Sequence, residues 1–161
     1  MGPICLRDVV LEAVRYLRPL AEARDIHIRV ASGGEDDVAI SGNHAALRRM
    51  FLALLDNALK YSAAGTEVRV SIVAKGSRFV VAVEDEGMGI APEDMPHIFQ
   101  RFYRANKARS DGGHGLGLSL AQSIALVHDA VIEASSEPGR GSVFQVSFER
   151  RAVHGSAVAI V

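Results

Sequence analysis

The most informative stretch of the chain is Val81-Ala82-Val83-Glu84-Asp85-Glu86-Gly87-Met88-Gly89-Ile90. Its apolar residues predict a strand that runs directly into an Asp-x-Gly-x-Gly turn. Asp85 then lies at the strand end, where its carboxylate can accept a hydrogen bond from an exocyclic amine. Gly87 and Gly89 would let the backbone come close to a flat base without an intervening side chain. Taken alone, the same residues are more often a simple turn.

A helix is predicted upstream of this strand, over residues 43–60. Apolar residues from Leu47 to Leu59 recur every three to four positions after the cap sequence Ser41-Gly42-Asn43. Asn57 lies late in the helix, and Lys60 follows three residues later on the same face. An amide oxygen beside a cation suits Mg²⁺ with substrate phosphates, because Mg²⁺ takes oxygen ligands and keeps several waters. The alternative is that Asn57 only hydrogen-bonds the neighbouring backbone.

A glycine-rich segment lies downstream, where Gly112-Gly113-His114-Gly115-Leu116-Gly117-Leu118 opens a helix predicted over residues 116–127. A glycine-rich helix start exposes unpaired N–H groups, which together with the helix dipole suit an anion such as phosphate. Such starts are common, so this segment is weak evidence alone. The Gly-x-Gly-x-x-Gly pattern of dinucleotide-binding proteins is not met, and the Gly-Lys-Ser phosphate loop is absent.

The remaining segments predict a two-layer α/β sandwich. Helical spacing covers residues 6–23, with Pro19 expected to kink the helix or begin a second one, and a strand follows at 26–30. Two hairpins are expected, one from strands 68–72 and 79–83 and one from strands 130–134 and 142–148. The polar, glycine-containing segment between them is too long for an ordinary connection and is interpreted as a mobile lid. We expect a mixed, largely antiparallel sheet with three main helices on one face.

The composition favours one compact domain, since the chain has 161 residues of which 48% are hydrophobic. We predict a disordered start or cloning remnant at 1–5, a domain at 6–149 with its lid at about 86–115, and a tail at 150–161. Lys plus Arg (18) nearly balance Asp plus Glu (19), which argues against nucleic acid binding. The single Cys5 excludes an internal disulfide and a multi-cysteine metal site. Neither a membrane span nor a signal peptide is expected.

The order and separation of the three motifs resemble the nucleotide-binding sites of the superfamily of gyrase, Hsp90, histidine kinases and MutL. The resemblance is closest to the catalytic, ATP-binding domain of sensor histidine kinases, and it extends from about residue 6 to residue 148. It implies a Bergerat-type ATP-binding fold. Asn57 matches the N box of that family, Asp85 with Gly87 and Gly89 its first glycine box, Gly113, Gly115 and Gly117 its second, residues 98–104 its aromatic F box, and residues 139–142 its final glycine box.

The resemblance also implies roles for individual residues. Asn57 would bind Mg²⁺, Lys60 would reach the phosphates of ATP, and Tyr61 would pack near the base. Asp85 would read the adenine amine, and the N–H groups of residues 115–117 would donate to phosphate oxygens. The implied catalytic set is Asn57, Lys60, Arg101 and Arg104, the two arginines approaching the terminal phosphate from the lid. The implied nucleotide-binding set is Asn57, Lys60, Tyr61, Asp85, Gly87, Gly89, Ile90, His114, Gly115, Leu116, Gly117, Leu118 and Ser142.

The chain departs from the family pattern at Ala53, where histidine kinases usually carry a second asparagine and gyrase-like ATPases a glutamate that activates water. Without a carboxylate base there, rapid ATP hydrolysis is not expected. None of the six histidines fits the phosphate-acceptor pattern of the kinases. His128, followed by Asp129, is expected to be structural at a helix end. The histidines are not clustered, so a metal site on them is not expected.

The resulting hypothesis is that this domain is the ATP-binding half of a histidine kinase. The domain would hold ATP-Mg²⁺ with its γ-phosphate presented to a histidine on a separate dimerisation domain, so that catalysis here is positioning. We expect a monomer that binds nucleotide and does not autophosphorylate alone. Its expected partners are the helical dimerisation domain of the same parent protein and a response regulator receiver domain. The parent is expected to be a membrane-anchored bacterial sensor, with this domain in the cytosol.

Three alternatives stay open. A nucleotide-gated regulatory module is favoured by Ala53, whereas an anti-sigma-type serine kinase is disfavoured by the F box. A dinucleotide-dependent oxidoreductase would bind NAD, which a fluorescence titration tests. Phosphohistidine formation on a separately made helical domain would distinguish the kinase from the regulatory module.

Overall fold

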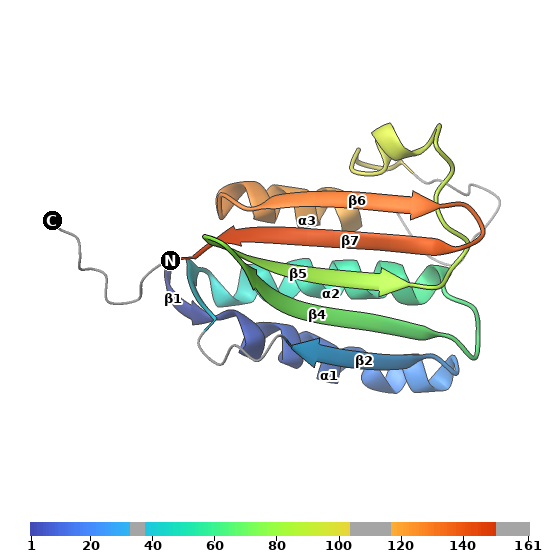
Figure 1. Ribbon diagram of the computed structural model, residues 1–161, viewed down its shortest axis with the longest axis horizontal. Helices are drawn as coiled ribbons and strands as arrows, with labels where there is room; N and C mark the ends of the chain where they lie inside the picture. Colours follow the sequence, from blue (N-terminus) through green and yellow to red (C-terminus); the bar gives the residue numbers. More distant parts are fainter. Residues whose placement is uncertain (33–37, 104–116, 151–161) are drawn as a thin grey trace, which may run out of the picture.

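The structure is a computed structural model, and it describes residues 1–32, 38–103 and 117–150. A five-stranded sheet of order β2-β4-β5-β7-β6 forms one layer, and α1, α2 and α3 form a second layer behind it in Figure 1. The predicted two-layer α/β sandwich is confirmed. The elements of the two layers are α1 (Leu6–Ala23), α2 (His44–Tyr61), α3 (Gly117–Val127), β2 (His27–Ser32), β4 (Glu67–Lys75), β5 (Arg78–Asp85), β6 (Val131–Glu137) and β7 (Gly141–Glu149).

The sheet is mixed, as the sequence predicts. β2 runs parallel to β4, whereas the β4–β5, β5–β7 and β6–β7 pairs are antiparallel. Both predicted hairpins therefore form. Because β5 and β7 are antiparallel neighbours, the last residue of β5, Asp85, lies beside Ser142 near the beginning of β7. The lid follows directly from this edge of the sheet, and its described part contains a short 3-10 helix, η1 (Met95–His97).

Two further strands form a small separate sheet that the sequence did not predict. β1 (Gly2–Cys5) pairs antiparallel with β3 (Ala39–Gly42). The predicted disorder of residues 1–5 is therefore wrong for residues 2–5. The physical reason is burial, since Ile4 pairs with the buried Ile40 and packs against the hydrophobic core. Each strand is only four residues long, too short for an alternating pattern to stand out.

The core fills the space between the sheet and the helices. The inward-facing side chains of β5 and β7, among them Val83 and Phe144, are buried. Phe51 of α2 packs against Phe148 of β7 with ring centroids 6.2 Å apart. α1 continues as one helix through Pro19, so the predicted second helix does not form. None of the helices in the described part of the chain has the length and apolar character that a bilayer span requires.

The N-terminus of α2 is capped by the residue that the sequence indicates. The side chain of Asn43 accepts a hydrogen bond from the N–H of Ala46 at 2.9 Å. The N–H of Asn43 donates in turn to Nε2 of His128 at 3.0 Å. Nδ1 of His128 lies 2.8 Å from the carbonyl oxygen of Ile124, an acceptor, so this nitrogen carries the proton. His128 thus joins the end of α3 to the start of α2, which agrees with a structural role.

We expect Asn43→Ala to lower the free energy of unfolding by about 1 kcal/mol, because the first turn of α2 loses its side-chain cap. Nucleotide affinity should not change, since Asn43 lies at the opposite end of α2 from Tyr61. Urea denaturation measures the first quantity and calorimetry the second. Unchanged stability would show that the cap contributes nothing.

Candidate functional site

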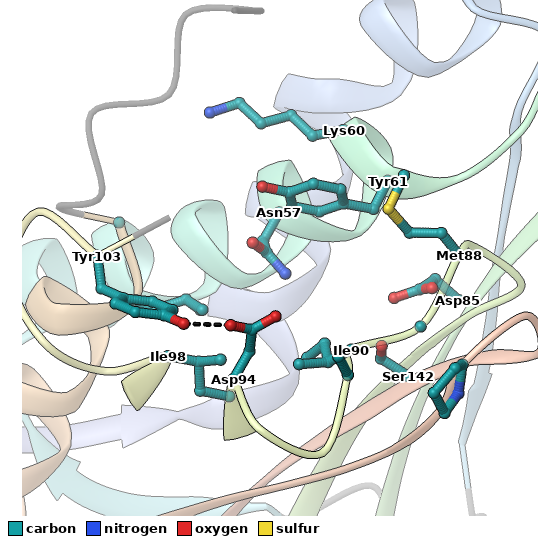
Figure 2. A pocket seen from close by; sticks show the side chains of 15 residues that line it. Asn57, Lys60, Tyr61, Asp85, Met88, Ile90, Asp94, Ile98, Tyr103 and Ser142 are labelled. Atoms are coloured by element: carbon teal, nitrogen blue, oxygen red, sulfur yellow. Dashed lines mark hydrogen bonds between the residues drawn. The ribbon is translucent and has the colours of Figure 1, made fainter. Parts of the chain in front are cut away.

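A cavity of about 330 Å³ opens where β5 ends, between α2, the lid, the start of α3 and the β6–β7 turn (Figure 2). It gathers the predicted site residues from distant parts of the chain. Those that line it are Asn57, Lys60, Tyr61, Asp85, Gly89, Ile90, Gly117, Leu118 and Ser142. Gly87 and Arg101 do not line the cavity. Arg104, His114, Gly115 and Leu116 lie outside the described residues.

Asp85 provides the buried charge of the site. Its residue exposure is 4%, and it points toward the cavity in Figure 2. Burial raises the pKa of the Asp85 carboxyl above its usual range, and backbone hydrogen bonds from Gly87 and Ser142 partly offset this rise. The Gly87 N–H donates to Oδ1 at 2.9 Å. The carboxylate is therefore held in place by backbone donors while it faces the cavity as an acceptor.

The two glycines of the Asp-x-Gly-x-Gly turn allow other backbone segments of the protein to pack closely against the turn. A Cβ added at Gly87 would collide with the carbonyl oxygen of Tyr61, and one added at Gly89 would collide with that of Glu137. Gly89 also has a φ of +76°, which disfavours a side chain. The sequence-based explanation was that both glycines let a flat base come close. For Gly87 the structure gives a different reason, because its backbone lies against the Tyr61 carbonyl at the end of α2.

Two serines extend the polar end of the site. Ser136 Oγ accepts from the Ile90 N–H at 2.6 Å, donates to the Gly141 carbonyl at 2.8 Å, and lies 3.1 Å from Ser142 Oγ. Ser142 lines the cavity, whereas Ser136 lies behind it. Ser136 was not among the predicted site residues because the predicted strand ended at 134, three residues before β6 does. The inward alternation from residue 132 would have identified it.

The last turns of α2 form another wall of the cavity. In Figure 2 the Asn57 amide points into the cavity, whereas the Lys60 side chain extends along the upper edge. Lys60 Nζ lies 3.5 Å from the Asp56 carboxylate. Ala53, one turn before Asn57, faces the start of α3, and its Cβ lies 4.0 Å from where a Gly117 Cβ would be. The Ala53 side chain itself offers no polar group where α2 faces the start of α3.

The described part of the lid, up to Tyr103, forms another side of the cavity. Ile98 is buried in the core, and the Phe99 ring packs edge-on against Phe144 with centroids 6.2 Å apart. The Tyr103 hydroxyl donates to Asp94, a hydrogen bond that raises the pKa of Tyr103 (Figure 2). Both residues line the cavity, together with four others that were not among the predicted site residues: Met88, Ala91, Ile98 and Pro138.

The two phenylalanines of the lid differ in their contacts. Phe99 attaches the lid to the core, but Phe102 is 65% exposed and does not. The Arg101 guanidinium lies over the Phe102 ring, 5.2 Å from its centroid. Arg101 therefore contacts Phe102 and does not line the cavity.

Comparison with known proteins identifies the family of the chain. Residues 42–152 match the family model described as "Histidine kinase-, DNA gyrase B-, and HSP90-like ATPase". The sensor-like histidine kinase SenX3 of Mycobacterium tuberculosis is 37% identical over 149 residues, which cover 91% of this chain and 36% of SenX3. The sensor histidine kinase RppB of Synechocystis is 37% identical over 145 residues, covering 88% of this chain and 32% of RppB. The chain thus spans about a third of the length of these relatives.

Solved structures show the same fold. The mycobacterial sensor histidine kinase MprB superposes with a TM-score of 0.83 at 26% identity, covering 93% of this chain and 99% of that one. The catalytic domain of histidine kinase ThkA has a TM-score of 0.81 at 17% identity, over 92% of this chain and 95% of that one, and it supports the fold alone. The chain therefore belongs to the family of histidine kinase-, DNA gyrase B- and HSP90-like ATPases, as an ATP-binding domain of the sensor histidine kinase type.

Proposed function

We propose that this domain holds ATP-Mg²⁺ in the cavity and presents the γ-phosphate to a histidine on a separate helical dimerisation domain. The observation that carries the proposal is the single cavity that joins Asn57, Asp85 and Leu118, one residue from each predicted motif. The chain is similar to about a third of the length of proteins that are named sensor histidine kinases. This similarity supports the same function.

The proposed orientation of ATP follows from the charges around the cavity. The buried Asp85 carboxylate accepts hydrogen bonds, so adenine would lie at this end with its amine toward Asp85. Tyr61, Met88 and Ile90 would cover the faces of the base. The phosphates would extend toward Lys60 and the start of α3, where the first N–H groups of a helix favour an anion. Arg101, which lies over Phe102, would need a lid rearrangement to approach the terminal phosphate. Arg104, which lies outside the described residues, stays part of the proposed catalytic set.

Mg²⁺ is part of the proposal through Asn57. In the described part of the chain, no three His, Cys, Asp or Glu side chains gather as a metal site. One amide oxygen on α2 fits the habit of Mg²⁺, which is bound by few protein ligands, by substrate phosphates and by water. The metal would neutralise phosphate charge. Lys60 would exchange its contact with Asp56 for the phosphates.

The partners proposed for the kinase are the dimerisation domain of a membrane-anchored parent protein and a response regulator receiver domain. The predicted end of the domain at 149 and the tail at 150–161 remain part of this proposal, whereas the predicted start at 6 moves to residue 2 because β1 packs with the domain. A nucleotide-gated regulatory module is the second candidate, because Ala53 removes a polar side chain one turn from Asn57. An anti-sigma-type serine kinase would require a serine-containing protein substrate in place of the histidine domain.

The test mixes the chain, ATP-Mg²⁺ and a separately purified helical domain from the same parent gene. We expect acid-labile phosphate on the helical domain and none on this chain alone. A helical domain whose phosphate-accepting histidine is replaced by alanine is the control. Tight ATP binding without phosphohistidine formation would favour the regulatory module.

We expect Asn57→Ala to remove the effect of Mg²⁺ on ATP binding. In the wild-type chain Mg²⁺ should strengthen binding, whereas in the variant the affinity in Mg²⁺ should fall by about tenfold, a loss of one charge-assisted ligand. Calorimetry with Mg²⁺ and with EDTA measures both affinities. Asn43→Ala, on the same helix, is the matched control. An Asn57→Ala chain that keeps its full response to Mg²⁺ would rule out this metal ligand.

A further inference from the structure

A row of polar side chains crosses the sheet at the edge of the cavity. Asp85 of β5 pairs with Ser142 of β7, which pairs with Ser136 of β6. The next inward-facing row, Val83, Phe144 and Ala134, is apolar. The helix-facing side of these three strands therefore changes from apolar to polar in one step, at the level of the cavity. Buried polar groups need partners, so the contacts of this row are informative.

The Ser136 hydroxyl has three partners, and their chemistry fixes the direction of each hydrogen bond. The Ile90 N–H can only donate, so Ser136 Oγ accepts from it at 2.6 Å. The Gly141 carbonyl can only accept, so the one proton of Ser136 goes to it at 2.8 Å. The contact of 3.1 Å with Ser142 must then use the proton of Ser142. The Ser136 hydroxyl therefore has no hydrogen-bonding capacity left. Ser142 donates its only hydroxyl proton to Ser136.

This arrangement has a consequence for the cavity. Ser142 lines the cavity and Ser136 does not. With its proton directed at Ser136, the Ser142 oxygen can only accept from a ligand or a water. Asp85 beside it also accepts. The polar end of the cavity is therefore a pair of acceptors, which suits an amino group and disfavours a carbonyl oxygen at the same place.

We propose that Ser136 is a positioning residue for base selection: it orients the Ser142 hydroxyl and fixes the Ile90 amide, so that the cavity prefers a 6-amino purine over a 6-oxo purine. The inference rests on the proposed placement of adenine at Asp85. Ser136 also attaches the beginning of the lid to the β6–β7 turn. The neighbouring bond from the Gly139 N–H to the Met88 carbonyl, 2.7 Å long, supports the same attachment.

The test compares ATP with inosine triphosphate, which carries a carbonyl oxygen in place of the adenine amine. In Ser136→Ala the Ser142 proton is free to turn toward the ligand. We expect ATP affinity to fall by about tenfold, the effect of one or two hydrogen bonds, and inosine triphosphate affinity to change little. The preference for ATP then shrinks by nearly the same factor. Displacement of a fluorescent ATP analogue measures both affinities.

Further variants separate positioning from loss of structure. Ser135→Ala removes the exposed serine on the opposite face of β6 and should change neither affinity. Ser136→Thr keeps the hydroxyl and should restore the preference, while Ser136→Cys, of similar shape but a weak hydrogen-bond partner, should behave as alanine does. Without nucleotide, the Ile90 amide should exchange its hydrogen faster in Ser136→Ala than in the wild-type chain.

An unchanged ratio of ATP to inosine triphosphate affinity in Ser136→Ala would overturn the inference. This holds whether both affinities stay as in the wild type or both fall equally together with the melting temperature. Asp85→Asn distinguishes this failure from failure of the proposed adenine placement. If Asp85→Asn binds ATP normally, the placement itself is wrong. If Asp85→Asn loses ATP while Ser136→Ala keeps the wild-type ratio, only the role of Ser136 is wrong.

Discussion

Asp85→Asn is expected to weaken ATP binding by about 100-fold, because a buried charged acceptor is replaced by a neutral amide that can turn a donor toward the adenine amine. Asp85 is 4% exposed, so water cannot replace the lost hydrogen bond. Glu84→Gln, an exposed change of the same charge on the adjacent residue, is the control and should bind nearly as the wild type does. Calorimetry measures both. ATP affinity that falls equally in the two variants would contradict a specific role for Asp85.

The same residue predicts opposite effects of pH on binding and on stability. Burial raises the pKa of Asp85, so its ionised form is lost at a higher pH than in an exposed aspartate, and ATP affinity should fall there as the solution is acidified. Stability of the free domain changes the other way. Since the folded pKa lies above the unfolded one, ionising Asp85 costs stability as the pH rises through the interval between them. Asp85→Asn should remove this pH dependence from the unfolding free energy.

Gly89→Ala is expected to destabilise the domain by roughly 3 kcal/mol or more, because positive φ and a steric collision add together. The φ of Gly89 is +76°, and an added Cβ would meet the Glu137 carbonyl and the Pro138 Cα. The start of the lid at Gly89 would be pushed away from the β6–β7 turn. The part of the cavity wall that Gly89 and Pro138 form would be displaced as well. Nucleotide binding should be lost even under conditions where the variant stays folded.

Gly139→Ala is the matched control for this collision. Gly139 lies in the β6–β7 turn with a φ of +82°, but an added Cβ would have nothing within 4 Å. Only the conformational cost, about 1 kcal/mol, is expected. Thermal or urea denaturation compares the two variants. Equal destabilisation of the two variants would mean that the contact between Gly89 and the β6–β7 turn contributes nothing to stability.

Much of the fold could be predicted because its elements are long and periodic. The helix containing Asn57 repeats its apolar residues from Leu47 to Leu59, and the strand before Asp85 is apolar from Phe79 to Val83. β1 and β3 were missed because each has only four residues. The separation between them, with α1 and β2 in the interval, makes their pairing a tertiary effect that no local pattern records.

The site could be predicted only where a residue type is unusual in its setting. An aspartate at the end of an apolar strand and an asparagine in an apolar helix stand out against their neighbours. Ser136 does not, since a serine near a turn is ordinary, and its importance comes from strand register that places it beside Ser142. The glycine roles were misjudged for a related reason. What Gly87 approaches, the Tyr61 carbonyl, depends on packing between elements far apart in the chain.

A crystal structure of the domain with Mg²⁺ and a non-hydrolysable ATP analogue tests the proposed ATP site most directly. We expect the adenine amine within hydrogen-bonding distance of the Asp85 carboxylate, with the phosphates between Asn57, Lys60 and the start of α3. Adenine bound away from Asp85, or phosphates at the Asp85 end of the cavity, would contradict it.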